Sequence, residues 1–326
     1  MDGASVDSWS VRLAADPGGV PGARRFVVEG VSAWGFDPLV ESAELVVSEL
    51  AGNAALHSGA RFMYVNLTAL SGGGVRVAVE DDGGVASGAV TPRAPAATDG
   101  ATGWRAQATT GRGLAIVSVL AAEWGVDVTT RGKRVWADIV DPDADNRVRP
   151  PSRGERPVGD EPSDGRLPPG WVLVRLAGCP VELSLQQDQH LDELVRELQL
   201  MASDNGTSRS RDIAAQISAL LSSPTHARLT GRRTAEQARA RGLDVVDIDM
   251  AMPREFSSLV QQLDTAVRRA DDLCRQDELL ALASSSELRE LRAWMTHQLV
   301  AQIERGEPPL PWSAWASRAP GGPDVR

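Results

Sequence analysis

The chain of 326 residues is poor in lysine, cysteine, histidine and aromatic residues. Its two cysteines, Cys179 and Cys274, lie far apart without metal-type spacing, so we expect reduced thiols rather than a disulfide framework or a zinc site. Lys133 is the single lysine, and the net charge is -10. Without a global basic field, direct DNA binding is not expected.

Long hydrophobic runs are also absent from the sequence. No apolar run approaches the roughly 18 residues that suggest a membrane span, and the first ten residues lack the basic and apolar regions of a signal peptide. We therefore expect a cytoplasmic protein without a membrane partner. A composition of 42% hydrophobic and 24% charged residues predicts a globular chain of about two domains.

The first half alternates between the periods of strands and helices. The expected elements are a strand at 9–14, a helix ending near 34, a helix from 37, strands at 62–70 and 75–80, a helix at 114–124, and strands at 126–129 and 135–139. Residues 83–110 are rich in Gly, Ala, Pro and Thr and show no sustained period, which predicts a lid or binding loop.

A change in composition marks the boundary to the second half. Residues 141–169 are rich in Pro, Gly, Asp and Arg and predict a linker between a domain at 1–140 and a mainly helical domain at 170–318, with a flexible tail at 319–326. Within that second domain we expect two short strands in 171–185, followed by helices at 186–201, 209–221, 234–241, 256–274 and 286–305.

Two polar residues that could take part in binding or catalysis lie on the helix that begins at residue 37. Glu49 and Asn53 are four residues apart, so their side chains share one face and could reach one pocket. The amide oxygen of Asn53 suits a hard cation. Taken alone, the pair could equally be solvated residues of an amphipathic helix.

A carboxylate follows the strand at 75–80. Asp81 can accept a hydrogen bond from an exocyclic amine, and Gly83 lets the backbone approach a ligand closely. Asp82 is the alternative acceptor, because the assignment could be wrong by one residue where two aspartates are adjacent. An ordinary strand-ending turn also has this composition.

A glycine-rich segment opens the helix expected at 114–124. Gly111, Arg112, Gly113 and Leu114 lead directly into that helix, so free backbone amides and the helix dipole favour a bound phosphate, and Arg112 could add charge. A Gly-x-Gly segment before a helix is common and is weak evidence for a phosphate site by itself. It gains significance here because it follows the Glu49/Asn53 and Asp81/Gly83 segments in the chain.

In this order and on these elements, the three segments resemble the N, G1 and G2 boxes of the Bergerat-fold (GHKL) ATP-binding domain. The resemblance is specifically to the anti-sigma factor and serine-protein kinase (RsbW-like) branch, and it covers about residues 8–140. It implies an α+β two-layer sandwich, with a mixed, mostly antiparallel sheet and helices on one face. The mainly α-helical domain that follows is expected from its periodicity and lies outside the resemblance.

The resemblance also implies roles for individual residues, with ATP and Mg²⁺ as cofactors. Glu49 would be the general base, Asn53 the Mg²⁺ ligand, and Asp81 the adenine reader next to Gly83. The phosphate loop would contain Gly111, Arg112, Gly113 and Leu114.

The arrangement of the chain narrows the choice of branch. Only about 35 residues, without histidine, precede the helix that carries Glu49, whereas sensor histidine kinases need a phosphoacceptor histidine there. The helical second half does not resemble the β/α transducer of the chaperone and gyrase branches.

We therefore expect an ATP-binding regulator with serine/threonine-protein kinase activity on a STAS-type anti-sigma antagonist, or one that sequesters a sigma factor. A homodimer is compatible with this expectation. Alternatives are a non-catalytic ATP-binding interaction module and an ATP hydrolase.

Some features depart from the family pattern or stay open. Arg134 stands where related domains often carry threonine on the last strand, which puts nucleotide affinity in question. Lys133 fits a solvated turn better than a phosphate contact, and His57 fits the end of a helix. The segment 308–315, with Pro and Trp, predicts either a partner-docking segment or a segment packed back onto the bundle.

Overall fold

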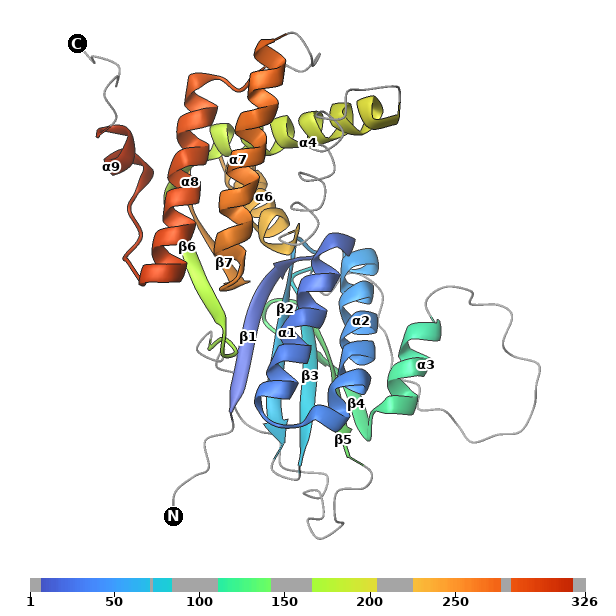
Figure 1. The fold of residues 1–326 in the computed structure, drawn as a ribbon. Helices are drawn as coiled ribbons and strands as arrows, with labels where there is room; N and C mark the ends of the chain where they lie inside the picture. Colours follow the sequence, from blue (N-terminus) through green and yellow to red (C-terminus); the bar gives the residue numbers. More distant parts are fainter. Residues whose placement is uncertain are drawn as a thin grey trace. The chain divides into compact units, whose positions relative to one another are not determined.

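The computed structural model describes residues 7–70, 73–83, 111–141, 166–203, 225–276 and 283–318. The predicted lid, most of the predicted linker, the predicted helix at 209–221 and the predicted tail at 319–326 lie outside the described residues. The chain divides into two compact units, Met1–Pro169 and Gly170–Arg326 (Figure 1). Within the described ranges, no helix is both long and apolar enough to cross a membrane.

The first unit contains a five-stranded sheet in which every neighbouring pair is antiparallel, in the order β1-β2-β3-β5-β4. Its strands are β1 (Ser8–Ala14), β2 (Phe62–Leu70), β3 (Gly74–Asp81), β4 (Glu123–Val128) and β5 (Lys133–Val140). Alternate residues along each strand therefore face the same side. Val65, Val79 and Val135 are in register across three strands and share one such side.

Helices cover one face of the sheet (Figure 1). They are α1 (Val20–Ala33) and α2 (Val40–His57), preceded by the short turns η1 (Pro17–Gly19) and η2 (Asp37–Leu39), with α3 (Gly111–Leu120) packed beside α2. The covered face is the side of Val65, because a Cβ on Gly30 in α1 would lie 2.5 Å from the side chain of Leu67, two residues along the same strand. The predicted apolar face of α2 is buried, including Val46, Val47 and Leu50. The unit is thus the predicted two-layer α+β sandwich.

Both predicted boundaries of one helix in this unit are wrong. The helix expected at 114–124 begins at Gly111 and ends at Leu120. Trp124 belongs to β4, where it is in register with Ala137 of β5. Pairing with β5 therefore decides the conformation of this segment.

The second unit is mainly helical around a two-stranded antiparallel ribbon. Its elements are β6 (Trp171–Pro180), α4 (Val181–Ser203), α6 (Thr225–Ala240), β7 (Val245–Pro253), α7 (Phe256–Arg275), α8 (Ser286–Arg305) and α9 (Trp312–Ala316). Most predicted helices fall within these elements, although α4 and α6 begin earlier than expected.

The prediction of two short strands in 171–185 is wrong. One strand, β6, continues through Gly178, which takes a positive φ of 60° at a bulge and donates its N–H to the Asp247 carboxylate. The partner strand β7 was not predicted. Its signal is the alternation of buried Ile248 and Met250 with the intervening aspartates.

The second unit has an apolar core between α4 and α7 and another between the ribbon and α8. Leu191, Leu194 and Val267 lie in the first, as the helical periodicity predicts. The segment before α9 packs back onto α8, because the Trp294 indole N–H donates to the Leu310 carbonyl at 2.9 Å. Of the two interpretations of this segment, packing is the one the structure shows.

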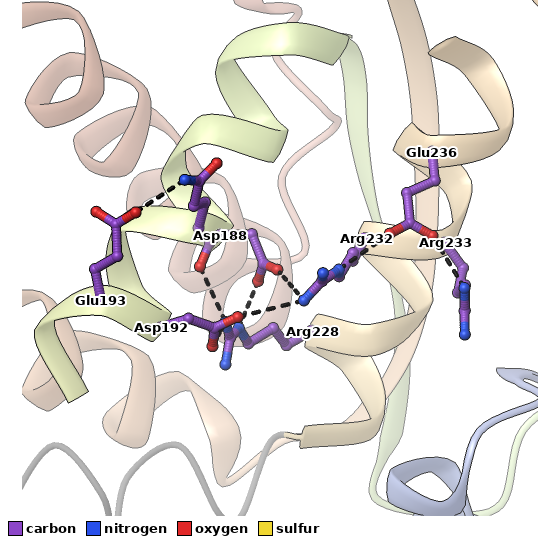
Figure 2. Close-up of polar contacts among 8 residues, drawn as sticks. Asp188, Asp192, Glu193, Arg228, Arg232, Arg233 and Glu236 are labelled. Carbon is purple, nitrogen blue, oxygen red and sulfur yellow. Dashed lines mark hydrogen bonds and ion pairs between the residues drawn. The ribbon is translucent and has the colours of Figure 1, made fainter. Parts of the chain in front are cut away.

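Ion pairs join α4 to α6 (Figure 2). Arg228 lies 2.5 Å from carboxylate oxygens of both Asp188 and Asp192, and Arg232 lies 3.1 Å and 3.3 Å from the same two residues. Burial raises the pKa of Asp188, although the two guanidinium groups oppose that effect. The matched spacing of four residues on both helices therefore aligns α4 with α6.

Candidate functional site

The structure brings Glu49 and Asn53 to the first turn of α3. A Cβ placed on Gly113 would lie 2.5 Å from Glu49 Oε2 and 3.5 Å from Asn53 Nδ2. A side chain at position 113 would therefore have to displace the end of the Glu49 side chain from its present place. Both polar side chains are half-buried, and neither hydrogen-bonds to another described residue. Their polar atoms are therefore not committed to structural contacts within the described chain.

Asp81 lies at the end of β3, on the side of the sheet that faces the helices. It follows Val79 on that side, is 4% exposed, and accepts a hydrogen bond at Oδ1 from the Gly83 N–H at 3.2 Å. The Lys133 ammonium lies 3.8 Å from Oδ2. Burial raises the pKa of Asp81, while the Gly83 N–H and the charge of Lys133 act in the opposite direction.

The neighbouring Asp82 carboxylate has a structural contact instead. Its Oδ1 accepts hydrogen bonds from the backbone N–H groups of Arg61 at 2.8 Å and Phe62 at 3.0 Å. Asp82 therefore holds the beginning of β2, whereas Oδ2 of Asp81 accepts no hydrogen bond within the described residues.

Close backbone contacts surround Asp81. A Cβ on Gly83 would overlap the carbonyl oxygen of Ser58, at the end of α2, and a Cβ on Gly132 would overlap the carbonyl oxygen of Asp81. Glycine is therefore required at both positions if this packing is kept. The sequence analysis did not identify Ser58 or Gly132 as part of the surroundings of Asp81. The only signal for them in the sequence was the glycine at position 132, just before the last strand.

Lys133 and Arg134 face opposite sides of the sheet. Lys133 is in register with Asp81 and Arg134 with Glu80. Arg134 donates to the Glu80 carboxylate at 2.9 Å on the side away from the helices. The residue that stands opposite the candidate base-reading aspartate is thus Lys133 and not Arg134, and the interpretation of Lys133 as a solvated turn residue is wrong.

The candidate phosphate segment is described only in part. Gly111 and Arg112 form the start of α3, and only their backbone is described. Gly113 is buried and Leu114 is half-buried. The first turn of α3 thus reaches Glu49 and Asn53 through Gly113. Free amides at such a helix start favour an anion beside these two side chains.

The residues present fit a nucleotide with Mg²⁺. In the described part of the chain, no group of three or more His, Cys, Asp or Glu could hold a metal ion. A single amide ligand from Asn53 suits Mg²⁺, which commonly keeps several waters and binds substrate phosphates. A Cβ on Gly113 would lie 3.5 Å from the Asn53 amide nitrogen, so glycine keeps the start of α3 free of a side chain beside that amide.

Comparison with known families agrees with this geometry. Residues 13–139 match the family model of the histidine kinase-like ATPase domain, a GHKL-type domain. No curated protein matches the chain. The matched range includes Glu49, Asn53, Asp81 and Gly113, and it ends before the second unit. The match supports ATP binding and a kinase-like function for the first unit.

Proposed function

We propose that the domain at residues 13–139 binds ATP with Mg²⁺ and transfers its γ-phosphoryl group to a serine or threonine of a partner protein. The observation that carries the proposal is the meeting of Glu49, Asn53 and Gly113, since it joins a base and a metal ligand to a helix start. The family match of the same residues supports the nucleotide.

Each residue then has a distinct role. Asp81 would accept a hydrogen bond from the adenine amine, and Asn53 would hold Mg²⁺ through its amide oxygen. The bound ion would supply charge neutralisation at the phosphates. Glu49 orients the attacking hydroxyl and accepts its proton as oxygen bonds to the γ-phosphorus and ADP leaves with the bridging oxygen.

The proposed partner is a STAS-type anti-sigma antagonist, with sequestration of a sigma factor as the regulatory output. This part rests on the resemblance of the sequence to the anti-sigma and serine-kinase branch, and it implies a cytoplasmic location. The second unit, which has its own cores, would serve as a regulatory or oligomerising domain.

Two substitutions on α2 test the proposal. Glu49→Ala is expected to keep Mg²⁺-dependent ATP binding but lose phosphotransfer, because the base acts on the nucleophile. Asn53→Ala is expected to lose Mg²⁺-dependent binding as well. Glu44→Ala, at an exposed position of the same helix, is the matched control and should behave as wild type.

Calorimetric titration with and without Mg²⁺ and labelled phosphotransfer to candidate antagonists provide the measurements. Phosphotransfer by Glu49→Ala at the wild-type rate would contradict the base role. ATP binding without transfer or hydrolysis would favour the non-catalytic interaction module, and phosphate release without a partner would favour the hydrolase.

A further inference from the structure

The single lysine of the chain stands opposite the candidate base-reading carboxylate. Lys133 opens β5 in register with Asp81, so both side chains lie on the side of the sheet that α2 covers. The Lys133 side chain is 29% exposed and that of Asp81 is 6% exposed. The two side chains therefore differ in exposure, since the carboxylate is enclosed and the ammonium is partly in contact with solvent.

The pair retains unused hydrogen-bonding capacity. The separation of 3.8 Å between Lys133 Nζ and Asp81 Oδ2 is an ion-pair distance but too long for a hydrogen bond. Within the described residues, the Lys133 ammonium donates no hydrogen bond, and the Asp81 carboxylate accepts only that of the Gly83 N–H, at Oδ1. An acceptor atom and a donor group with unused hydrogen-bonding capacity thus lie side by side.

Other acidic groups near Lys133 do not compete for it. Glu80 lies on the opposite side of the sheet, where it accepts hydrogen bonds from Arg134 at 2.9 Å and from Thr129 at 2.7 Å. Asp82 accepts backbone N–H groups of β2. In the described part of the chain, Asp81 is the only carboxylate with which Lys133 forms an ion pair.

We propose that Lys133 is a second base-reading residue, whose ammonium donates a hydrogen bond to N1 of adenine while Asp81 accepts one from the 6-amino group. The inference deepens the proposed ATP function and rests on it. The Watson–Crick edge of adenine presents a donor at the amine beside an acceptor at N1, which complements the acceptor and donor of this pair.

The same geometry determines which bases are rejected. Asp81 is held in place by its burial and by the Gly83 N–H, so a 6-oxo base such as hypoxanthine would place a carbonyl oxygen against the carboxylate. Two acceptors that face each other without a proton between them are unfavourable. ITP is therefore expected to bind more weakly than ATP.

A chemical double-mutant cycle tests the contact to N1. ATP and 1-deaza-ATP, in which N1 is replaced by C–H, are titrated calorimetrically into wild type and Lys133→Met. Wild type should bind 1-deaza-ATP roughly tenfold or more weakly than ATP, because a charged hydrogen bond is lost. Lys133→Met should bind ATP more weakly by a similar factor and should not distinguish the two nucleotides.

Two further variants separate the contact from a general effect of charge. Lys133→Arg retains a cationic donor and should regain most of the discrimination. Arg134→Gln removes a neighbouring positive charge on the opposite side of the sheet and should titrate as wild type. Thermal unfolding of each variant is the measurement that checks whether it is folded.

The outcomes distinguish the inference from the function on which it rests. If wild type binds ATP and 1-deaza-ATP equally, or if the effects of Lys133→Met and of the deaza substitution are additive, Lys133 does not contact N1, and ATP binding itself stands. If folded wild-type protein fails to bind ATP, both the proposed function and this inference are wrong.

Discussion

Adjacent carboxylates at the end of β3 have different environments. Asp81 faces the helices next to Lys133, whereas Asp82 accepts backbone N–H groups of Arg61 and Phe62. Asp81 is the last residue of the strand, whereas Asp82 lies just beyond it and is held by the backbone where β2 begins. At the scale of single residues, ligand binding and stability should therefore respond to different members of the pair.

Asp81→Asn is expected to weaken ATP binding by roughly 1.5 to 3 kcal/mol, because a charge-assisted hydrogen bond to the base becomes a neutral one or is lost. The free energy of unfolding should change little, since burial already disfavours the charged form, as the raised pKa of Asp81 indicates. Asp82→Asn should show the reverse, with ATP affinity retained and stability lowered by about 1 kcal/mol. Calorimetric titration measures the ATP affinity, and denaturant unfolding measures the stability. Loss of affinity in Asp82→Asn alone would show that Asp82, and not Asp81, contacts the base.

A buried polar cluster joins three elements of the second unit. Asp271 of α7 lies 2.9 Å from the Arg292 guanidinium of α8, and it accepts hydrogen bonds from the N–H and hydroxyl of Ser284. Ser284 Oγ also lies 2.9 Å from Nε2 of His190 on α4. Asp271 has no exposed surface, so loss of its charge would leave Arg292 buried without its closest partner.

The pH dependence of stability should report this cluster. Burial raises the pKa of Asp271, but His190, Ser284 and Arg292 outweigh that effect and lower it to about 2, below the ordinary value of 3.8. The stabilisation is therefore present above about pH 4 and is lost as the pH falls toward 2, with a magnitude of roughly 2 kcal/mol. Denaturant unfolding at several pH values should show a difference between wild type and Asp271→Asn that shrinks in this range.

Asp272→Asn is the matched control at the element scale, because its carboxylate is 52% exposed and pairs only with Arg275 among the described residues. Its free energy of unfolding should differ little from that of wild type at any pH. A difference for Asp271→Asn that does not change between pH 5 and 2 would contradict the lowered pKa.

At the scale of the whole molecule, the chain contains two units, each with its own buried core. The sheet and helices of the first unit enclose residues such as Phe26 and Leu67, and the second unit encloses Phe256 and Trp294. The end of the segment predicted as a linker belongs to the first unit, since the Ser10 N–H on β1 donates to the Arg166 carbonyl at 3.0 Å.

Fragments 1–169 and 170–326 are each expected to fold, and fragment 1–169 should bind ATP with the affinity of the full chain. A shorter fragment that ends at Gly154 lacks the Arg166 carbonyl, so it should bind ATP but be less stable by about 1 kcal/mol. Circular dichroism, thermal unfolding and calorimetry test these expectations. An unfolded fragment 1–169, or one without ATP affinity, would show that the first unit depends on the second.

The sequence alone determined those features that depend on local periodicity and on short-range chemistry. Apolar spacing of three and four residues indicates α2, α7 and α8 because a helix repeats every 3.6 residues along the chain. The same local rule places Glu49 and Asn53 on one helical face, and the glycines at positions 111 and 113 mark a helix start. These features need no knowledge of the distant chain.

Only the tertiary structure decided the features that depend on pairing between distant residues. β6 pairs with β7 across the intervening helices, and the side of the sheet that Lys133 occupies follows from its register with Asp81. A shift of one residue would have exchanged Lys133 with Arg134, because successive side chains in a strand face opposite sides. The contact of Gly113 with Glu49 likewise follows from the packing of α3 on α2. Such contacts are set by how the elements pack against one another, which local sequence patterns do not encode.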